Sequence, residues 1–60
     1  MLNRLDSIIQ LAHEITQQAY NLKFELQEAD SGRGIIMQGY PEACMRQIAI
    51  KADILKANAQ

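Results

Sequence analysis

Small and apolar residues recur in steps of four and three through the first half of the chain, without leaving that register. Their average period of 3.5 residues is typical of a helix that packs lengthwise against another helix. The line continues for about four heptads and predicts one long helix. Its members are Met1, Leu5, Ile8, Ala12, Ile15, Ala19, Leu22, Leu26 and Ala29.

This first helix is expected over about residues 3–30. Asn3 is a favourable N-cap residue, and Asp6 stands three residues later, where a capping box places its acid. The stretch contains neither proline nor glycine. Gly32 follows it, where a left-handed residue is favoured after a helix.

A second helix is predicted over about residues 41–58. Pro41 suits the first helical position, and Glu42 suits the positive end of the helix dipole. The same steps of four and three return along this stretch. The apolar line there consists of Pro41, Met45, Ile48, Ala52, Leu55 and Ala59.

The connecting segment, residues 31–40, is too apolar for a free loop because it contains Ile35, Ile36 and Met37. The second helix is shorter than the first, so this segment is expected to fold back over the uncovered end of the first helix. Gly32-Arg33-Gly34 is interpreted as a turn, since it lacks the lysine and the serine or threonine of a phosphate-binding loop. Residues 1–60 thus form a single helical-hairpin domain.

The heptad layers alternate small and large residues, an arrangement that allows helices to approach closely. Position a holds Leu5, Ala12, Ala19 and Leu26, and position d holds Ile8, Ile15, Leu22 and Ala29. This layer pattern is similar to that of Rop, the plasmid copy-number regulator, whose hairpins dimerise into a four-helix bundle. The similarity concerns packing alone and carries no function across.

A chain of 60 residues has little core of its own and needs an additional source of stability. A single cysteine excludes an internal disulfide, and one cysteine with one histidine is too few for a structural zinc site. We therefore predict an all-α helix-loop-helix hairpin that forms a homodimeric antiparallel four-helix bundle. The predicted bundle core is Leu5, Ile8, Ala12, Ile15, Ala19, Leu22, Leu26, Met45, Ile48, Ala52 and Leu55.

A net charge of −1 gives no general attraction to nucleic acid or to an anionic membrane. No segment has the roughly 20 apolar residues of a membrane span, and the N-terminus does not resemble a signal peptide. A cytoplasmic protein without cofactor or metal is expected. The six basic residues form no stripe within one chain.

No acid–base or nucleophile–base pair has a catalytic spacing, so we expect no enzymatic activity and no catalytic residue. His13 lies off the seam and is interpreted as a surface residue. Cys44 has two interpretations, a reactive thiol near a helix N-terminus or a small apolar residue at the edge of the core.

Tyr20 and Phe24 form an i,i+4 pair on the outer face of the first helix, away from the predicted core. Either residues 35–37 cover Phe24, or the pair belongs to an exposed patch with an acidic rim. Aromatic and methionine anchors with a charged rim are typical of protein-binding surfaces. The candidate patch is Tyr20, Phe24, Glu25, Glu28, Asp30, Ile36, Met37 and Tyr40.

The sequence therefore favours a small protein-binding regulator or inhibitor that masks a surface of its partner, as phage- or plasmid-type modulators of host proteins do. The acidic rim favours a partner with a basic face. An RNA-binding dimer is one alternative, because a dimer could assemble a basic surface across chains. A structural subunit of a larger assembly is the other.

Overall fold

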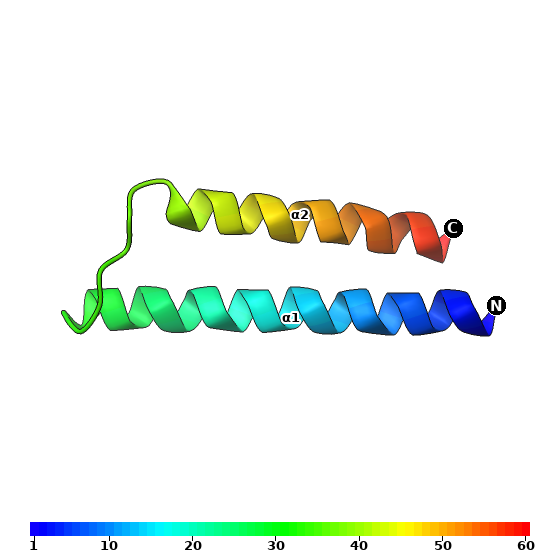
Figure 1. The fold of residues 1–60 in the computed structure, drawn as a ribbon, viewed down its shortest axis with the longest axis horizontal. Helices are drawn as coiled ribbons and strands as arrows, with labels where there is room; N and C mark the ends of the chain where they lie inside the picture. Colours follow the sequence, from blue (N-terminus) through cyan, green and yellow to red (C-terminus); the bar gives the residue numbers. More distant parts are fainter.

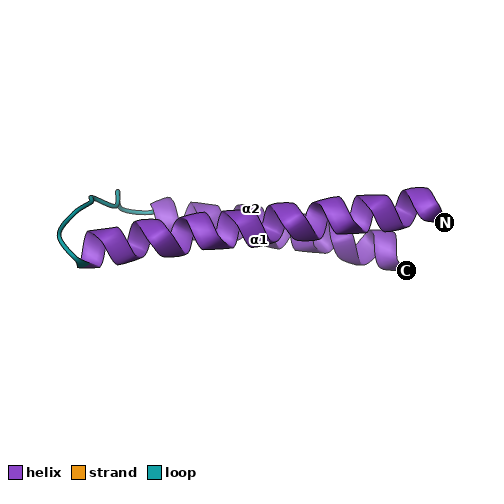
Figure 2. Cartoon of the chain, turned by 90° about the horizontal axis from the view of Figure 1, so that it is seen from below, coloured by secondary structure: helices purple, strands orange, loops and turns teal.

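The computed structural model describes all 60 residues and shows two antiparallel helices joined by a loop, without strands (Figure 1). Helix α1 spans Leu2–Asp30 and helix α2 spans Tyr40–Ala59. Viewed from below, the hairpin is a single pair of helices with nothing else packed on it (Figure 2). The predicted all-α helical hairpin is confirmed. Neither helix has the combination of length and apolarity that crossing a bilayer requires.

The start of α1 differs from the prediction. The helix begins at Leu2, Met1 stands at the N-cap without a side-chain hydrogen bond, and the predicted cap at Asn3 is wrong. The Leu5 amide donates to the Met1 carbonyl over 3.1 Å, which extends the helical hydrogen bonding beyond Asn3. Asn3 consequently lies within the first turn, where its side chain does not cap the helix.

Two glycines adopt left-handed backbone at the helix ends, Gly32 as predicted and Gly39 in addition. Gly32 follows α1 with φ 79°, and its amide donates to the Ala29 carbonyl over 3.0 Å. Gly39 precedes α2 with φ 85°, and Pro41 occupies the first turn as predicted. Left-handed backbone is costly for a residue with a Cβ atom, so these two turns depend on glycine.

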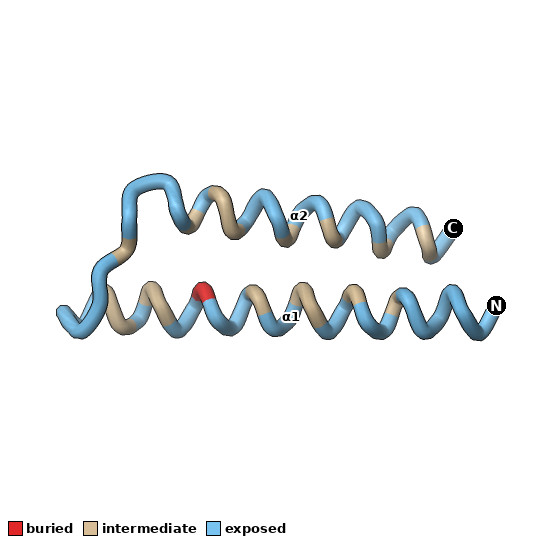
Figure 3. The backbone as a smooth tube through the Cα atoms, in the orientation of Figure 1, coloured by how far each residue is buried: buried red, intermediate tan, exposed pale blue.

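The helices meet along one seam, in which half-buried residues recur in steps of three and four (Figure 3). Leu22 is the only buried side chain, with 7% of its surface exposed. The seam consists of Ile8, Leu11, Ile15, Gln18, Leu22 and Glu25 on α1 and Pro41, Cys44, Ile48, Lys51, Leu55 and Asn58 on α2.

This seam is offset from the predicted apolar line. It contains the d positions, such as Ile15 and Leu22, with the residues on their polar flank, such as Gln18. The a positions are displaced to the other side, because two helices touch along one line and one neighbour covers only part of a wide stripe. Within one chain Leu5, Ala12, Ala19, Met45 and Ala52 are exposed, and Leu26 is half-buried.

Polar contacts fix the alignment of the helices along the seam. The Arg4 guanidinium donates to the backbone carbonyls of Asn58 and Gln60. Lys51 Nζ lies 3.9 Å from Glu14 Oε1, and Tyr40 lies beside Glu25. Helix α2 therefore runs alongside α1 from about Glu25 to Arg4. Because α1 has 29 residues and α2 has 20, α1 extends past α2 at both ends (Figure 1).

The loop lies against the end of α1, as predicted, but buries little of its apolar trio. Ile35 is 95% exposed and Met37 is 77% exposed, while Ile36 is half-buried and no helical turn forms. The loop passes the Glu28 side of α1, where a Cβ atom on Gly34 would lie 3.4 Å from the Glu28 Cβ. Arg33 Nε donates to Glu28 Oε2 over 2.5 Å, which ties the loop to that side.

Leu22→Ala is expected to lower the free energy of unfolding by about 2–5 kcal/mol, because it removes the one buried side chain and leaves a cavity. Urea unfolding followed by circular dichroism measures the change at a fixed protein concentration. Ile35→Ala is the control, with an expected change within about 0.5 kcal/mol. Equal losses for both variants would show that Leu22 is not the centre of packing.

Candidate interaction surfaces

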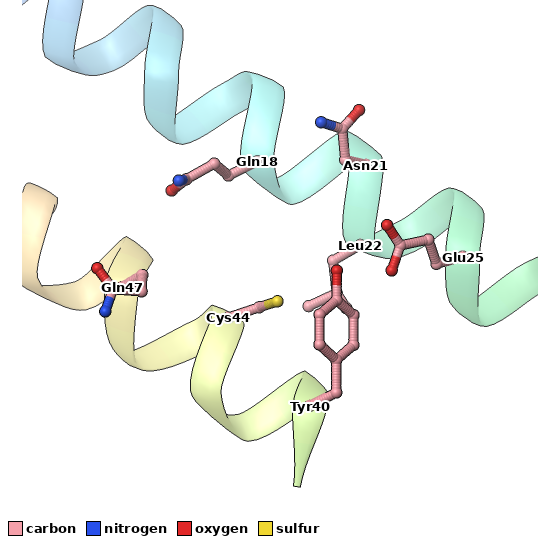
Figure 4. Close-up of a pocket in the computed structure, with 7 residues that line it drawn as sticks. All are labelled: Gln18, Asn21, Leu22, Glu25, Tyr40, Cys44 and Gln47. Atoms are coloured by element: carbon pink, nitrogen blue, oxygen red, sulfur yellow. The ribbon is translucent and has the colours of Figure 1, made fainter. Parts of the chain in front are cut away.

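The hairpin has two unlike sides, and the first is polar. Between the helices lies a hollow of about 200 Å³, here called the polar hollow (Figure 4). Four of its seven lining residues carry amide or carboxylate side chains, and Leu22 is part of its apolar lining. The lining residues are Gln18, Asn21, Leu22 and Glu25 from α1 and Tyr40, Cys44 and Gln47 from α2.

Tyr40 spans this hollow, with its hydroxyl pointing toward α1 between Glu25 and Cys44 (Figure 4). Hydrogen bonding to the Glu25 carboxylate and then to Cys44 raises the pKa of the Tyr40 phenol well above its ordinary value near 10. A carboxylate beside the phenol disfavours a second negative charge. The phenol is thus held protonated, as a hydrogen-bond donor between the helices.

The polar hollow supplies no catalytic pair. Cys44 is half-buried beside Tyr40, and His13, the one histidine, is exposed and does not line the hollow. The half-buried position fits the interpretation of Cys44 as a small residue at the edge of the core. The Gln18 Oε1 atom is buried without a hydrogen-bond partner in the same wall. No cluster of three histidine, cysteine or carboxylate side chains is placed to hold a metal ion.

The second side of the hairpin is apolar. A groove there contains Ala19, Leu26 and Met45 together with Leu22, which also lines the polar hollow. The groove and the hollow therefore flank the same seam on opposite sides. Toward the chain termini, Leu5 and Ala59 line a second hollow on this side. The apolar face consists of Leu5, Ala12, Ala19, Leu26, Met45, Ala52 and Ala59.

Tyr20 and Phe24 lie on the outside of α1, with 64% and 61% of their surfaces exposed. No loop residue covers this aromatic pair: Ile35 and Met37 extend into solvent, and Ile36 is half-buried. Of the two interpretations of the pair, the exposed one agrees with the structure.

The other predicted patch residues are divided between places. Tyr40 and Glu25 belong to the polar hollow, and Glu28 is paired with Arg33. Asp30 is exposed at the end of α1 and has no ion pair. The structure therefore brings Tyr20 and Phe24 together but places Tyr40 on a different side of α1. The polar hollow itself was not predicted, because most of its residues are polar and a search for apolar periodicity does not mark them.

Half of the basic side chains are already engaged within the chain. Arg4 binds carbonyls at the end of α2, Arg33 pairs with Glu28, and Lys51 lies near Glu14. Lys23, Arg46 and Lys56 have no ion pair. Residues Arg46 and Lys56 are ten positions apart on α2, which separates their directions by about 80° at 100° per residue. No basic stripe forms on the hairpin.

The chain matches no protein-family model, and neither a characterised protein nor a solved structure shows significant similarity to it. The similarity to Rop therefore remains one of layer pattern.

The Tyr40 phenol is expected to ionise above pH 10 in the folded chain. Tyr20→Phe leaves Tyr40 as the single tyrosine, so ultraviolet absorbance follows its titration alone. Adding Glu25→Ala should lower the midpoint toward 10, since it removes the largest cause of the shift. An unchanged midpoint would show that Glu25 does not hold the phenol.

The same pKa shift makes the fold sensitive to alkali. The pKa of the Tyr40 phenol is higher in the folded chain than in the unfolded chain. The protonated phenol therefore stabilises the fold, and this stabilisation is complete below about pH 10. That stabilisation is lost as pH rises through the folded value, because the unfolded chain then releases the proton more readily.

Proposed function

We propose that the chain is a homodimeric, non-catalytic protein-binding regulator, in which two hairpins pack through their apolar faces into a four-helix bundle. The observation that carries the dimer is the exposed apolar face. Its residues follow the heptad a positions on both helices and lie on one side of the seam. A continuous apolar stripe of this kind is normally buried against another helix.

The area of the surface supports a second copy as the occupant of this face. The hairpin has an accessible surface of 4886 Å² for a mass of 6.8 kDa. A compact monomer of that mass would expose about 3,950 Å². The excess of roughly 900 Å² is close to the ~800 Å² that each partner buries in an interface of standard size.

The extent of the chain supports the same proposal. The radius of gyration of the Cα atoms is 14.2 Å, whereas a compact chain of 60 residues would have about 10.4 Å. One buried side chain is too small a core to offset the conformational entropy of 60 residues. Dimerisation supplies the missing burial without a disulfide or a metal.

Binding of another protein is assigned to the aromatic pair. Tyr20 and Phe24 point away from α2 and are not needed for the hairpin seam. Aromatic side chains supply large contact areas and are frequent energetic centres of protein interfaces. The exposed Asp30 carboxylate and the net charge of −1 favour a partner with a basic face. Contact would mask the bound surface of that partner.

The structure favours this function over RNA binding. A nucleic-acid surface requires free cations gathered on one face. Three of the six cations are engaged within the chain, and the other three form no stripe.

Ala19→Lys is expected to dissociate the dimer. In one chain Ala19 is exposed, so lysine fits the hairpin, but the dimer would bury an unpaired charge. The dissociation constant should rise at least ~100-fold, measured by sedimentation equilibrium. Ala57→Lys is the matched control, since Ala57 is also an exposed helical alanine but lies outside the apolar face. A dimer that tolerates Ala19→Lys would contradict the assigned interface.

Phe24→Ala is expected to abolish capture of a protein partner by the immobilised chain, while the dimer and its helix content remain unchanged. Ile35→Ala provides the control, because Ile35 is an equally apolar exposed side chain outside the aromatic pair. The protein retained by the unaltered chain and by Ile35→Ala should be missing with Phe24→Ala. Retention by all three would exclude the aromatic pair as the binding surface.

A further inference from the structure

The orientation of the second copy follows from the unequal lengths of the two helices. Two hairpins that pack face to face about a two-fold axis have two arrangements. With the axis along the helices, both loops lie at the same end, and α1 packs on α2 of the second copy. With the axis across the helices, the loops lie at opposite ends, and α1 packs on α1.

The two arrangements differ in how much of α1 they cover. Helix α2 runs beside α1 only from about Glu25 to Arg4. With both loops at the same end, α2 of the second copy would cover that same stretch and leave Leu2 bare. With loops at opposite ends, the 29 residues of α1 lie along the 29 residues of its counterpart. Leu2, which is 76% exposed in one chain, is then covered.

The apolar line of α1 matches the same line of a second α1 that runs in the opposite direction. Leu5, Ala12, Ala19 and Leu26 follow at intervals of seven residues, and their midpoint falls between residues 15 and 16. The midpoint of α1, which spans Leu2–Asp30, is residue 16. Antiparallel pairing about the midpoint of this line sets Leu5 opposite Leu26 and Ala12 opposite Ala19, and it overlaps the two helices to within one residue. Two central alanine layers permit close approach, and leucines fill the layers on either side.

We propose that the second copy packs antiparallel along α1 with its loop at the opposite end, so that both Tyr20–Phe24 pairs lie on one side of the dimer. This inference rests on the proposed dimer. Residues 20–24 of the two copies lie about 20 Å apart along the bundle, at 1.5 Å per residue. The dimer therefore offers two equivalent aromatic pairs on one surface, which fits a partner that presents two copies of a binding segment or an extended one.

Spin labels at position 31 test the orientation. Ser31→Cys with Cys44→Ser places one label at the exposed loop end of α1. Loops at opposite ends put the two labels about 45 Å apart, and loops at the same end put them below about 25 Å. Pulsed electron spin resonance measures the distance, and light scattering of the same sample measures its mass. A short distance within a dimer would overturn the orientation alone, whereas a monomer would overturn the proposed dimer with it.

Disulfide formation gives a second measurement that does not depend on the labels. Leu5→Cys and Leu26→Cys are prepared separately, each with Cys44→Ser, and are then mixed and oxidised. The mixture should form a covalent heterodimer. Neither variant should cross-link with itself, because like positions lie about 31 Å apart along the bundle. Like-with-like cross-links, or a dimer without any cross-link in the mixture, would contradict the antiparallel pairing.

Discussion

The structure depends on the fact that two helices touch along a single line. The apolar stripe of α1 is wider than the strip that α2 covers, so one neighbour buries only part of it. The d positions and their polar flank form the seam within the chain, and Leu22 is the one buried side chain there. The a positions stay on the opposite side of the seam. Folding of one chain thereby creates the apolar face that the proposed dimer uses.

Much of the fold was predictable from the spacing of the apolar residues and from the position of Gly32. Steps of four and three predicted two helices, and Gly32 marked the turn after α1 correctly. The outward position of Phe24 also follows from the heptad, since it lies farthest from the apolar line. These features are local, and each is fixed by a few neighbouring residues.

The offset of the seam was not predictable in this way. An apolar stripe shows that a helix has neighbours but does not show which flank meets which neighbour. The contacts along the observed seam join residues far apart in the sequence: Arg4 with the end of α2, Glu14 with Lys51, and Glu25 with Tyr40. In the loop, only Ile36 of the apolar trio is half-buried, and Arg33 bonds to Glu28 on α1. Hydrophobicity alone does not encode these polar contacts.

The proposed function assigns a different contact to each surface of the hairpin. The polar hollow holds the helices together through Tyr40, and the apolar face is assigned to a second copy. The aromatic pair lies outside the polar hollow, with Tyr20 bordering Ala19, and it is assigned to a partner protein. The basic side chains form no stripe on the hairpin. A regulator that acts by masking its partner requires one surface for the dimer and another for the partner protein.

Sedimentation equilibrium of the unaltered chain, with circular dichroism over the same range of dilution, tests the central claim most directly. At high concentration the measured mass should be twice the 6.8 kDa of one chain. Mass and helix content should then fall together on dilution, because a hairpin with one buried side chain does not hold its helices alone. A monomer that stays fully helical at every concentration would contradict the account.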